Sequence, residues 1–385
     1  MSKLEELIQQ YCPDGVEWKT LGEATIMKRG TSATKGIMQE GDIPVISGGR
    51  QPAFYCNVSN RTGEVITVAG SGAGAGYVQY WNEPIFVCDA FSIQGNETLK
   101  TKYVYYILTN IQEKIYSTKK GGGVPHVHIS SIDKFEIPVP PLPVQEEIVR
   151  ILDAFTELQA ELQAELQKRK QQYNYYLDNL LNFNNINRGG YQAEVRWMKL
   201  KDIGKVCMCK RILKSQTSSS GDVPFFKIGT FGGNADAYIS QALFNEYKAK
   251  YSYPQKGEVL ISAAGTIGRT IVFDGTPSYF QDSNIVWLKH DESIVLNSYL
   301  RYCYALNPWV VSTGGTIARL YNDNILEATI PVPSLANQQR IVSILDRFDT
   351  LTTDLTQGLP AEIEKRRQQY EYYRDKLLTF KRKGA

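Results

Sequence analysis

The sequence lacks the long apolar run that a membrane span requires. No stretch of about 18 or more consecutive apolar residues occurs, and the first residues, MSKLEELIQQYCPDGVEW, lack the apolar core of a signal peptide. Six cysteines are scattered over 385 residues, and Cys207 and Cys209, the one close pair, fit neither a disulfide framework nor a zinc-finger spacing. These absences predict a cytoplasmic protein with reduced thiols and no metal site.

The sequence is also poor in histidine and in charge of one sign. The net charge is only +3, which does not by itself indicate a nucleic-acid partner. Residues 186–337 are the basic part, with 16 Lys and Arg against 12 Asp and Glu, although a solvated face could have the same composition. With three histidines, no N-P-P-Tyr/Phe or D-P-P-Tyr motif and no Gly-Lys-Ser/Thr phosphate loop, the chain does not fit an independent methyltransferase or a motor.

What the sequence does contain is an internal repeat. Five blocks recur in the same order: GVEWKTLGE (15–23) as EVRWMKLKDIG (194–204), GDIPVIS (41–47) as GDVPFFK (221–227), GEVITVAGSGAGAGYV (63–78) as GEVLISAAGTIGRTIV (257–272), FEIPVPPLPVQEEIVRILDAF (135–155) as ATIPVPSLANQQRIVSILDRF (328–348), and KRKQQYNYYLDNLLNF (168–183) as KRRQQYEYYRDKLLTF (365–380). Five matches in one order indicate a duplication.

Each half changes its periodicity once. Short apolar runs between Gly, Pro and Asn predict strands and turns, and after I-P-V-P the apolar residues step by three or four, which predicts a long helix with a narrow seam. We expect an α+β protein with two similar mixed α/β lobes (1–143 and 186–336) and two long antiparallel coiled-coil helices (144–185 and 337–385), related by a pseudo-two-fold axis. The seam residues expected to pair the helices or dock partners are Leu158, Leu162, Leu166, Tyr173, Tyr176, Leu351, Leu355, Tyr370 and Tyr373.

The two helical segments differ in length. Asp153 and Gln171 are 18 residues apart, whereas Asp346 and Gln368 are 22 apart, and the extra residues surround Gly358 and Pro360, where we expect a kink or an interruption. The first segment contains LQAELQAELQ, whose four-residue units would change the helix by about 6 Å each. Helix length is therefore expected to be an adjustable spacer.

The repeated order V-E-W-x-x-L-G, I-P-V-P, Q-x-x-I-V-x-I-L-D-x-F and Q-Q-Y-x-Y-Y-x-D-x-L-L resembles the specificity subunit of type I restriction–modification systems over the whole chain. The resemblance implies that each lobe is a target-recognition domain that reads one half of a split, asymmetric site in double-stranded DNA. It also implies that the helices set the gap between the halves and dock two methyltransferase subunits, through which restriction subunits join. The chain itself would have neither a catalytic site nor a cofactor.

Glycine loops in each lobe are the candidate DNA contacts. Gly70–Gly76 follows a predicted strand. A second glycine loop, which spans Lys119–His128 in the first lobe and Ser312–Arg319 in the second, precedes the last strand of each lobe and contains cations and His or Arg. Such loops can bring backbone amides close to phosphates. The candidate DNA-binding residues are Arg50, Ser71, Lys119, Lys120, Gly122, His126, His128, Lys210, Arg211, Lys214, Thr266, Arg269, Thr313, Gly315 and Arg319, with Gln51 and Lys227 as weaker candidates.

Other interpretations of these residues stay open. Gly70–Gly76 fits G-x-G-x-x-A and could be a nucleotide site, but its second copy lacks the pattern. His126 and His128 could bind a metal, although the second copy has no histidine there. The loops could be plain surface, and the chain could be a coiled-coil scaffold whose lobes bind proteins or sugars.

Overall fold

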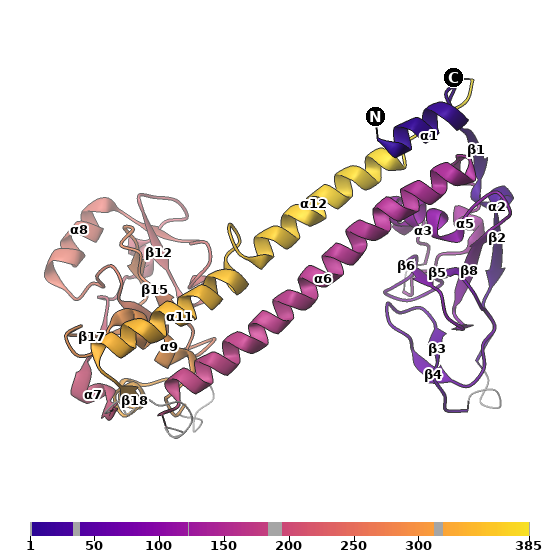
Figure 1. Ribbon diagram of the computed structural model, residues 1–385. Helices are drawn as coiled ribbons and strands as arrows, with labels where there is room; N and C mark the ends of the chain where they lie inside the picture. Colours follow the sequence, from indigo (N-terminus) through magenta and orange to yellow (C-terminus); the bar gives the residue numbers. More distant parts are fainter. Residues whose placement is uncertain (1, 34–38, 122, 184–194, 312–318, 385) are drawn as a thin grey trace. The chain divides into compact units, whose positions relative to one another are not determined.

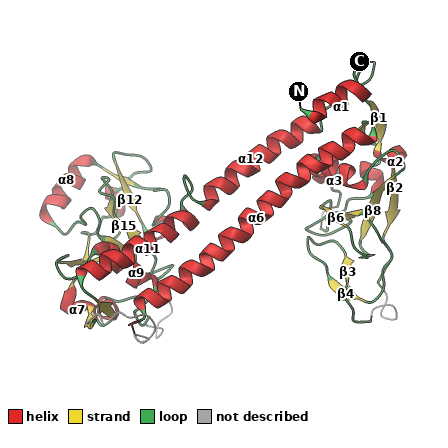
Figure 2. Ribbon diagram, in the orientation of Figure 1, coloured by secondary structure: helices red, strands yellow, loops and turns green. Residues whose placement is uncertain are grey.

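The computed structural model describes residues 2–33, 39–121, 123–183, 195–311 and 319–384. The chain divides into two compact units, residues 1–164 with 361–385 and residues 165–360. Each unit therefore combines one lobe with part of the helical segments, and both lobes contain strands and short helices (Figure 2).

The first lobe contains three small sheets. A four-stranded antiparallel sheet has the order β2-β8-β5-β6, a three-stranded sheet has the order β4-β3-β7, and β1 pairs with β9. The strands are β1 (Glu17–Thr20), β2 (Thr25–Arg29), β3 (Ile43–Ile46), β4 (Phe54–Cys56), β5 (Val65–Ala69), β6 (Val78–Trp81), β7 (Phe86–Val87), β8 (Ala90–Gly95) and β9 (Glu136–Val139). The helices are α1 (Lys3–Tyr11), α2 (Leu21–Ala24), α3 (Thr101–Asn110), α4 (Gln112–Tyr116) and α5 (Ile129–Ile132). Helix α3 packs on β5, β6 and β8, which buries the apolar strand residues in one core.

The second lobe has the same topology. Its sheets have the orders β11-β17-β14-β15, β13-β12-β16 and β10-β18, which match the first lobe strand for strand. The strands are β10 (Arg196–Lys199), β11 (Gly204–Met208), β12 (Val223–Phe226), β13 (Tyr238–Ile239), β14 (Val259–Ser262), β15 (Thr270–Val272), β16 (Tyr279–Phe280), β17 (Ile285–His290) and β18 (Thr329–Val332). The helices are α7 (Leu200–Ile203), α8 (Gln241–Lys250), α9 (Asn297–Ala305) and α10 (Asn322–Leu326), with 3-10 turns at Lys214–Gln216 and Ile228–Thr230. The predicted pair of similar lobes is confirmed.

A buried glutamine joins each lobe to its long helix. Gln145 is fully buried; its oxygen accepts the Lys100 N–H at 2.9 Å, and its amide nitrogen donates to the carbonyls of Thr98 and Pro140. Gln338 makes the same three bonds, with the backbone groups of Leu296, Ile294 and Pro333. The matching sequence blocks thus encode the same junction twice, because a buried amide needs all its partners.

The long helices pair within each unit. They are α6 (Leu142–Leu181), α11 (Leu335–Thr353) and α12 (Leu359–Leu377). In the first unit Phe155 of α6 stacks on Tyr373 of α12, with ring centroids 5.5 Å apart. In the second unit the equivalent rings, Tyr176 of α6 and Phe348 of α11, are 5.1 Å apart, and both ring pairs are inclined by 26°. Within each unit the paired segments run antiparallel, as predicted (Figure 1).

The second helical segment is interrupted between Thr353 and Leu359, as the Gly358 and Pro360 pattern predicted. Asp354 caps the interruption by accepting the N–H groups of Thr356 and Gln357, and a Cβ on Gly358 would lie 2.4 Å from the Thr350 carbonyl oxygen. The seam assignment of Leu355 is wrong, since this residue lies inside the interruption and is 79% exposed. The other predicted seam residues lie on α6, α11 or α12 and are half-buried or buried, except Tyr373, which is 38% exposed.

Candidate nucleic-acid interface

Each lobe has a cavity at the same place in its fold. It lies beside the turn that leads from β7 to β8, or from β16 to β17, and beside the segment that follows the second glycine loop. The first cavity encloses about 240 Å³ and the second about 550 Å³. Asp89 and Asp282 both line their cavities and are each the second residue after β7 or β16, and His126 and Arg319, which also line them, fall at matching places of the sequence repeat. The duplication has therefore kept the cavity and an acidic residue, whereas the histidine of the first lobe is an arginine in the second.

Backbone contacts assemble the first-lobe interface from three distant loops. The Gly72 N–H donates to Pro125 at 3.0 Å, and Lys120 and His126 exchange two backbone hydrogen bonds. A Cβ on Gly74 would lie 2.4 Å from the Gly48 oxygen, so only glycine permits this approach. Gly72 and Gly76 have positive φ, which confirms the predicted tight turn.

The candidate side chains of the first lobe gather on these loops. His126 and His128 stack with their ring centroids 5.9 Å apart, and both line the cavity with Arg29. The Ser71 hydroxyl donates to Asp89. Arg50 lies over the Tyr77 ring at 5.0 Å and Lys119 over the Tyr116 ring at 4.1 Å; burial raises the pKa of Tyr116, which Arg50 partly offsets. Candidate Gly122 lies outside the described residues.

The second-lobe cavity is strongly cationic. Its lining contains four cations, namely Arg211, Lys214, Lys227 and Arg319. Asp282 accepts a hydrogen bond from Arg211 at 2.9 Å, and Asp236 pairs with Lys227 at 2.8 Å. The Arg319 guanidinium instead donates to the Ser283 carbonyl at 2.7 Å, and Lys214 is exposed without an ion pair among the described residues. Two positive charges in the cavity therefore have no carboxylate partner in the described part of the chain.

Three candidates of the second lobe lie outside this cavity. Lys210 stands over the Tyr251 ring at 5.1 Å, and Arg269 donates to the Gly232 carbonyl at 3.2 Å. Thr266 uses its carbonyl to accept a hydrogen bond from the Ser262 hydroxyl. Thr313 and Gly315 lie outside the described residues.

Sequence reasoning missed several cavity residues. Arg29, Cys88 and Asp89 line the first cavity, and Gln281, Asp282 and Asn284 line the second. Each lies at the end of a strand or in a short turn, where no periodicity marks it. Extending the repeat comparison to FVCDAF (86–91) and YFQDSN (279–284) would have paired Asp89 with Asp282.

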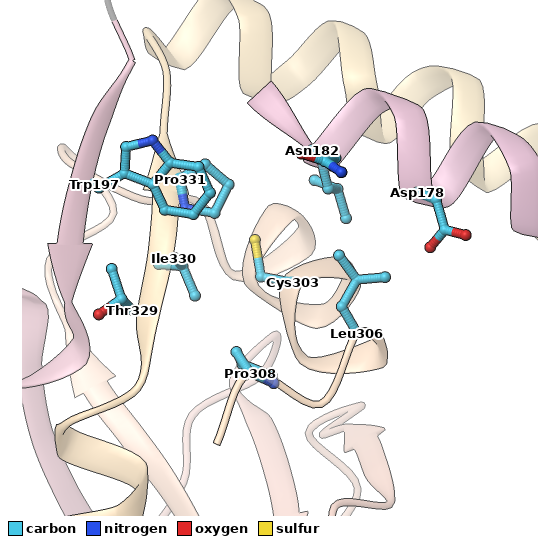
Figure 3. Close-up of a pocket in the computed structure, with 10 residues that line it drawn as sticks. Asp178, Asn182, Trp197, Cys303, Leu306, Pro308, Thr329, Ile330 and Pro331 are labelled. Carbon is cyan, nitrogen blue, oxygen red and sulfur yellow. The ribbon is translucent and has the colours of Figure 1, made fainter. Parts of the chain in front are cut away.

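A further cavity of about 390 Å³ lies in the second unit, between the end of α6 and the β10-β18 pair. Trp197, Pro331 and the Cys303 sulfur face it in Figure 3, and Asp178 stands at its edge. No candidate DNA contact lines it. In the first unit the matching tryptophan, Trp18, is covered by the Arg382 guanidinium at 5.2 Å from its ring.

The described residues also bear on two other classes of protein, membrane proteins and metalloproteins. No helix in this part of the chain is long and apolar enough to cross a membrane. Among the same residues no group of three or more His, Cys, Asp and Glu side chains is arranged to hold a metal ion.

Comparison with known proteins agrees with the duplicated architecture. A family model described as type I restriction modification DNA specificity domain matches residues 13–190 and again residues 192–365. A protein of Haemophilus influenzae assigned as a type I restriction enzyme specificity subunit is 46% identical, with 95% of this chain and 96% of that protein covered. The EcoR124I/EcoR124II specificity subunit of Escherichia coli is 32% identical, with 99% and 97% covered.

The fold is also found among solved structures. The S subunit of a type I restriction–modification system from M. genitalium matches with a TM-score of 0.61 at 17% identity, over 94% of this chain and 95% of that one. Such specificity subunits are the non-catalytic, DNA-directed members of their complexes. The chain belongs to the family of type I restriction–modification specificity subunits.

Proposed function

We propose that each lobe reads one half of a split, asymmetric site in double-stranded DNA through the surface around its cavity. The observation that supports this most directly is the equivalent placement of the two cavities. The first is lined by Arg29 and two histidines and the second by four cations, and in both the lining comes from segments far apart in the sequence. Cations and backbone amides suit phosphates, whereas polar groups recessed among them suit base edges. The linings differ chemically, which suits an asymmetric site.

We also propose that the helical segments set the gap between the two half-sites. They would dock two methyltransferase subunits, and restriction subunits would join through those. The paired helices carry four tyrosines that a partner subunit could contact where they reach the surface, namely Tyr173, Tyr176, Tyr370 and Tyr373. Segments 1–143 and 186–336 would then be the target-recognition domains, and 144–185 and 337–385 the spacer and docking regions.

The test of the recognition proposal uses the chain assembled with its methyltransferase partner. Adenine methylation is mapped on a random DNA library, and one split sequence is expected. The double variant His126→Ala with His128→Ala should relax one half of that sequence, and Arg211→Ala should relax the other. Methylation without a sequence preference would refute the proposal, and relaxation of both halves by either variant would refute the division between lobes.

The spacer proposal has its own experiment. Deleting Leu158–Glu161 removes about 6 Å of helix, and one base-pair step is about 3.4 Å, so the tolerated gap should change by one or two base pairs. Native mass spectrometry of the same complex should show two methyltransferase subunits for each chain. An unchanged gap in a correctly assembled complex would refute the spacer role.

A further inference from the structure

The turn Gln281–Asn284 forms one wall of the second-lobe cavity. It connects β16 to β17, and all four of its residues line the cavity. Ser283 has φ +54°, one of two non-glycine residues with positive φ in the part of the chain that is described. A serine in this region of conformational space is strained, and such strain persists only where the surroundings impose it.

The surroundings of this turn do impose its shape. The Arg319 guanidinium donates to the Ser283 carbonyl at 2.7 Å, and the Asn284 carbonyl accepts the Ala263 N–H at 2.8 Å. Gln281 accepts the Ile228 N–H on its side-chain oxygen at 2.9 Å, and Asp282 accepts from Arg211. Three of the four residues are therefore held in place by side-chain hydrogen bonds. Gln281 and Asp282 use their own side chains, and the Ser283 carbonyl is bound by the side chain of Arg319.

Asn284 carries the second carboxamide of the turn. The residue is half-buried and lines the cavity, and its side-chain oxygen and nitrogen make no hydrogen bond to another described residue. An amide with both groups available matches the N6 donor and N7 acceptor of adenine in the major groove. The Gln281 oxygen already accepts a hydrogen bond, which makes Gln281 a poorer candidate for the same bidentate contact.

The first lobe supports a specific role for this turn. There only Cys88 and Asp89 connect β7 to β8, whereas four residues connect β16 to β17, and neither Cys88 nor Asp89 carries an amide. The longer turn accompanies the larger cavity and brings two carboxamides into it. An acidic residue is present in both turns, so the two carboxamides are what distinguishes the turn of the second lobe from that of the first.

We propose that the turn Gln281–Asn284 is the base-reading element of the second lobe, with Asn284 contacting an adenine and Arg319 acting as the positioning residue that holds the turn. This inference rests on the proposed function, since it names the residue that reads one base of the second half-site. It also changes the role expected of Arg319 from a direct DNA contact to the support of a reader.

The first experiment replaces Asn284 in the chain assembled with methyltransferase. Methylation rates are measured on oligonucleotides that vary each base of both half-sites. Asn284→Ala should lower the preference for adenine at one position of one half-site by roughly 5- to 100-fold, the range for loss of one bidentate pair. Asn284→Asp keeps the acceptor and loses the donor, so preference at that position should move toward cytosine, whose N4 donates.

The control is Asn245→Ala, since Asn245 is an exposed asparagine of the same lobe on α8 that does not line the cavity. It should leave every preference unchanged. Intact selectivity at the other half-site shows that each variant is folded and assembled. If the wild-type complex shows no sequence preference, the proposed function is contradicted. If the wild type is selective but the Asn284 variants keep the same preferences, or lose activity equally at all positions, only this inference is contradicted.

The second experiment tests Arg319 as a positioning residue. Arg319→Ala should relax the same base position as Asn284→Ala, and the double variant should lose no more than either single one, because both act through one contact. Arg319→Lys, which can still donate to the Ser283 carbonyl, should restore much of the preference. Relaxation at a different position, with additive losses, would instead identify Arg319 as a direct reader.

Discussion

The two lobes share a topology and differ in what their cavities contain. Strand order, the β1-β9 and β10-β18 pairs and the buried glutamine junctions are repeated, whereas the linings contain His126 and His128 in one lobe and Arg211 and Lys214 in the other. The repeated glutamines are fully buried, where a changed residue would lose packing and hydrogen bonds. The variable ones lie on loops, where side chains change at little cost to the fold.

The two units are most alike where each lobe joins its long helix. Besides the glutamines, Tyr106 donates to Asp153 in the first unit and Tyr302 to Asp346 in the second. Burial is the main reason why the pKa of both hydroxyls lies far above the ordinary tyrosine value. The same tyrosine–aspartate bond therefore fastens α3 to α6 and α9 to α11.

The largest expected effect on stability comes from removing the buried glutamine of one junction and leaving the other intact. Gln145→Leu or Gln338→Leu would leave one part-buried N–H and two carbonyls without a partner. Each should lower the free energy of unfolding of its own unit by about 3 to 5 kcal/mol. Hydrogen exchange resolved by mass spectrometry measures each unit separately. Gln171→Leu, on the exposed side of α6, is the control. A large loss in one unit and none in the other would show that the junctions are not equivalent.

A smaller effect on DNA affinity should show how the cationic second-lobe cavity differs from the first. Lys214 is exposed and has no ion pair in the described structure, so Lys214→Ala should weaken binding of the assembled complex to all DNA sequences by roughly 3- to 10-fold near 0.15 M salt, and lower the salt slope by about 1. Lys250, which pairs with Glu246 on α8, provides the control Lys250→Ala. Titrations at several salt concentrations measure both quantities. A loss confined to one DNA sequence would make Lys214 a base reader instead.

The sequence was sufficient to predict the architecture because the internal repeat is visible in it. Duplicated blocks predicted twin lobes, and three- and four-residue spacing predicted the paired helices. The extra residues around Gly358 and Pro360 predicted the interruption. Leu355 was wrong because the spacing was counted through the interruption, where the chain no longer follows helical geometry. A period describes a residue's face only while the helix continues.

The cavities could be predicted only in part. Arg211, Lys214 and Arg319 were recognised as cations, and they do converge. Asn284 gave no signal, since a single asparagine after a strand is ordinary. Its importance depends on a cavity assembled from several separate segments of the sequence. The bond between Arg319 and the Ser283 carbonyl is equally invisible in sequence, because it depends on the strained conformation of one residue.

The junctions should also differ in their response to acid, by less than the effects above. The Glu147 side chain is 4% exposed, and hydrogen bonds from Arg150, with Lys3 nearby, lower its pKa to about 2; the matching residue in the second half is Arg340. A lowered pKa in the folded state stabilises the first unit above the ordinary glutamate pKa of 4.5, and this contribution is lost as the pH falls toward 2.

Glu147→Gln should therefore destabilise the first unit by about 1 kcal/mol at neutral pH, a modest figure because Arg150 and Lys3 are largely exposed. The difference from the wild type should shrink between pH 4.5 and 2. Thermal unfolding followed across this range measures it, and Glu161→Gln, on the exposed side of α6, is the control. A pH-independent difference would assign the effect to packing.

The smallest expected effect concerns the interruption, the clearest departure from symmetry in the helical segments. Leu355 is 79% exposed, so Leu355→Ala should change the free energy of unfolding of the second unit by less than about 0.5 kcal/mol. Leu345→Ala, on α11 in the same unit, removes a fully buried side chain and should cost about 2 to 5 kcal/mol. If assembly with methyltransferase makes Leu355→Ala costly while the isolated chain tolerates it, then a partner covers this leucine. The interruption would in that case be a contact specific to one half of the molecule, since α6 has no matching exposed leucine loop in its continuous helix.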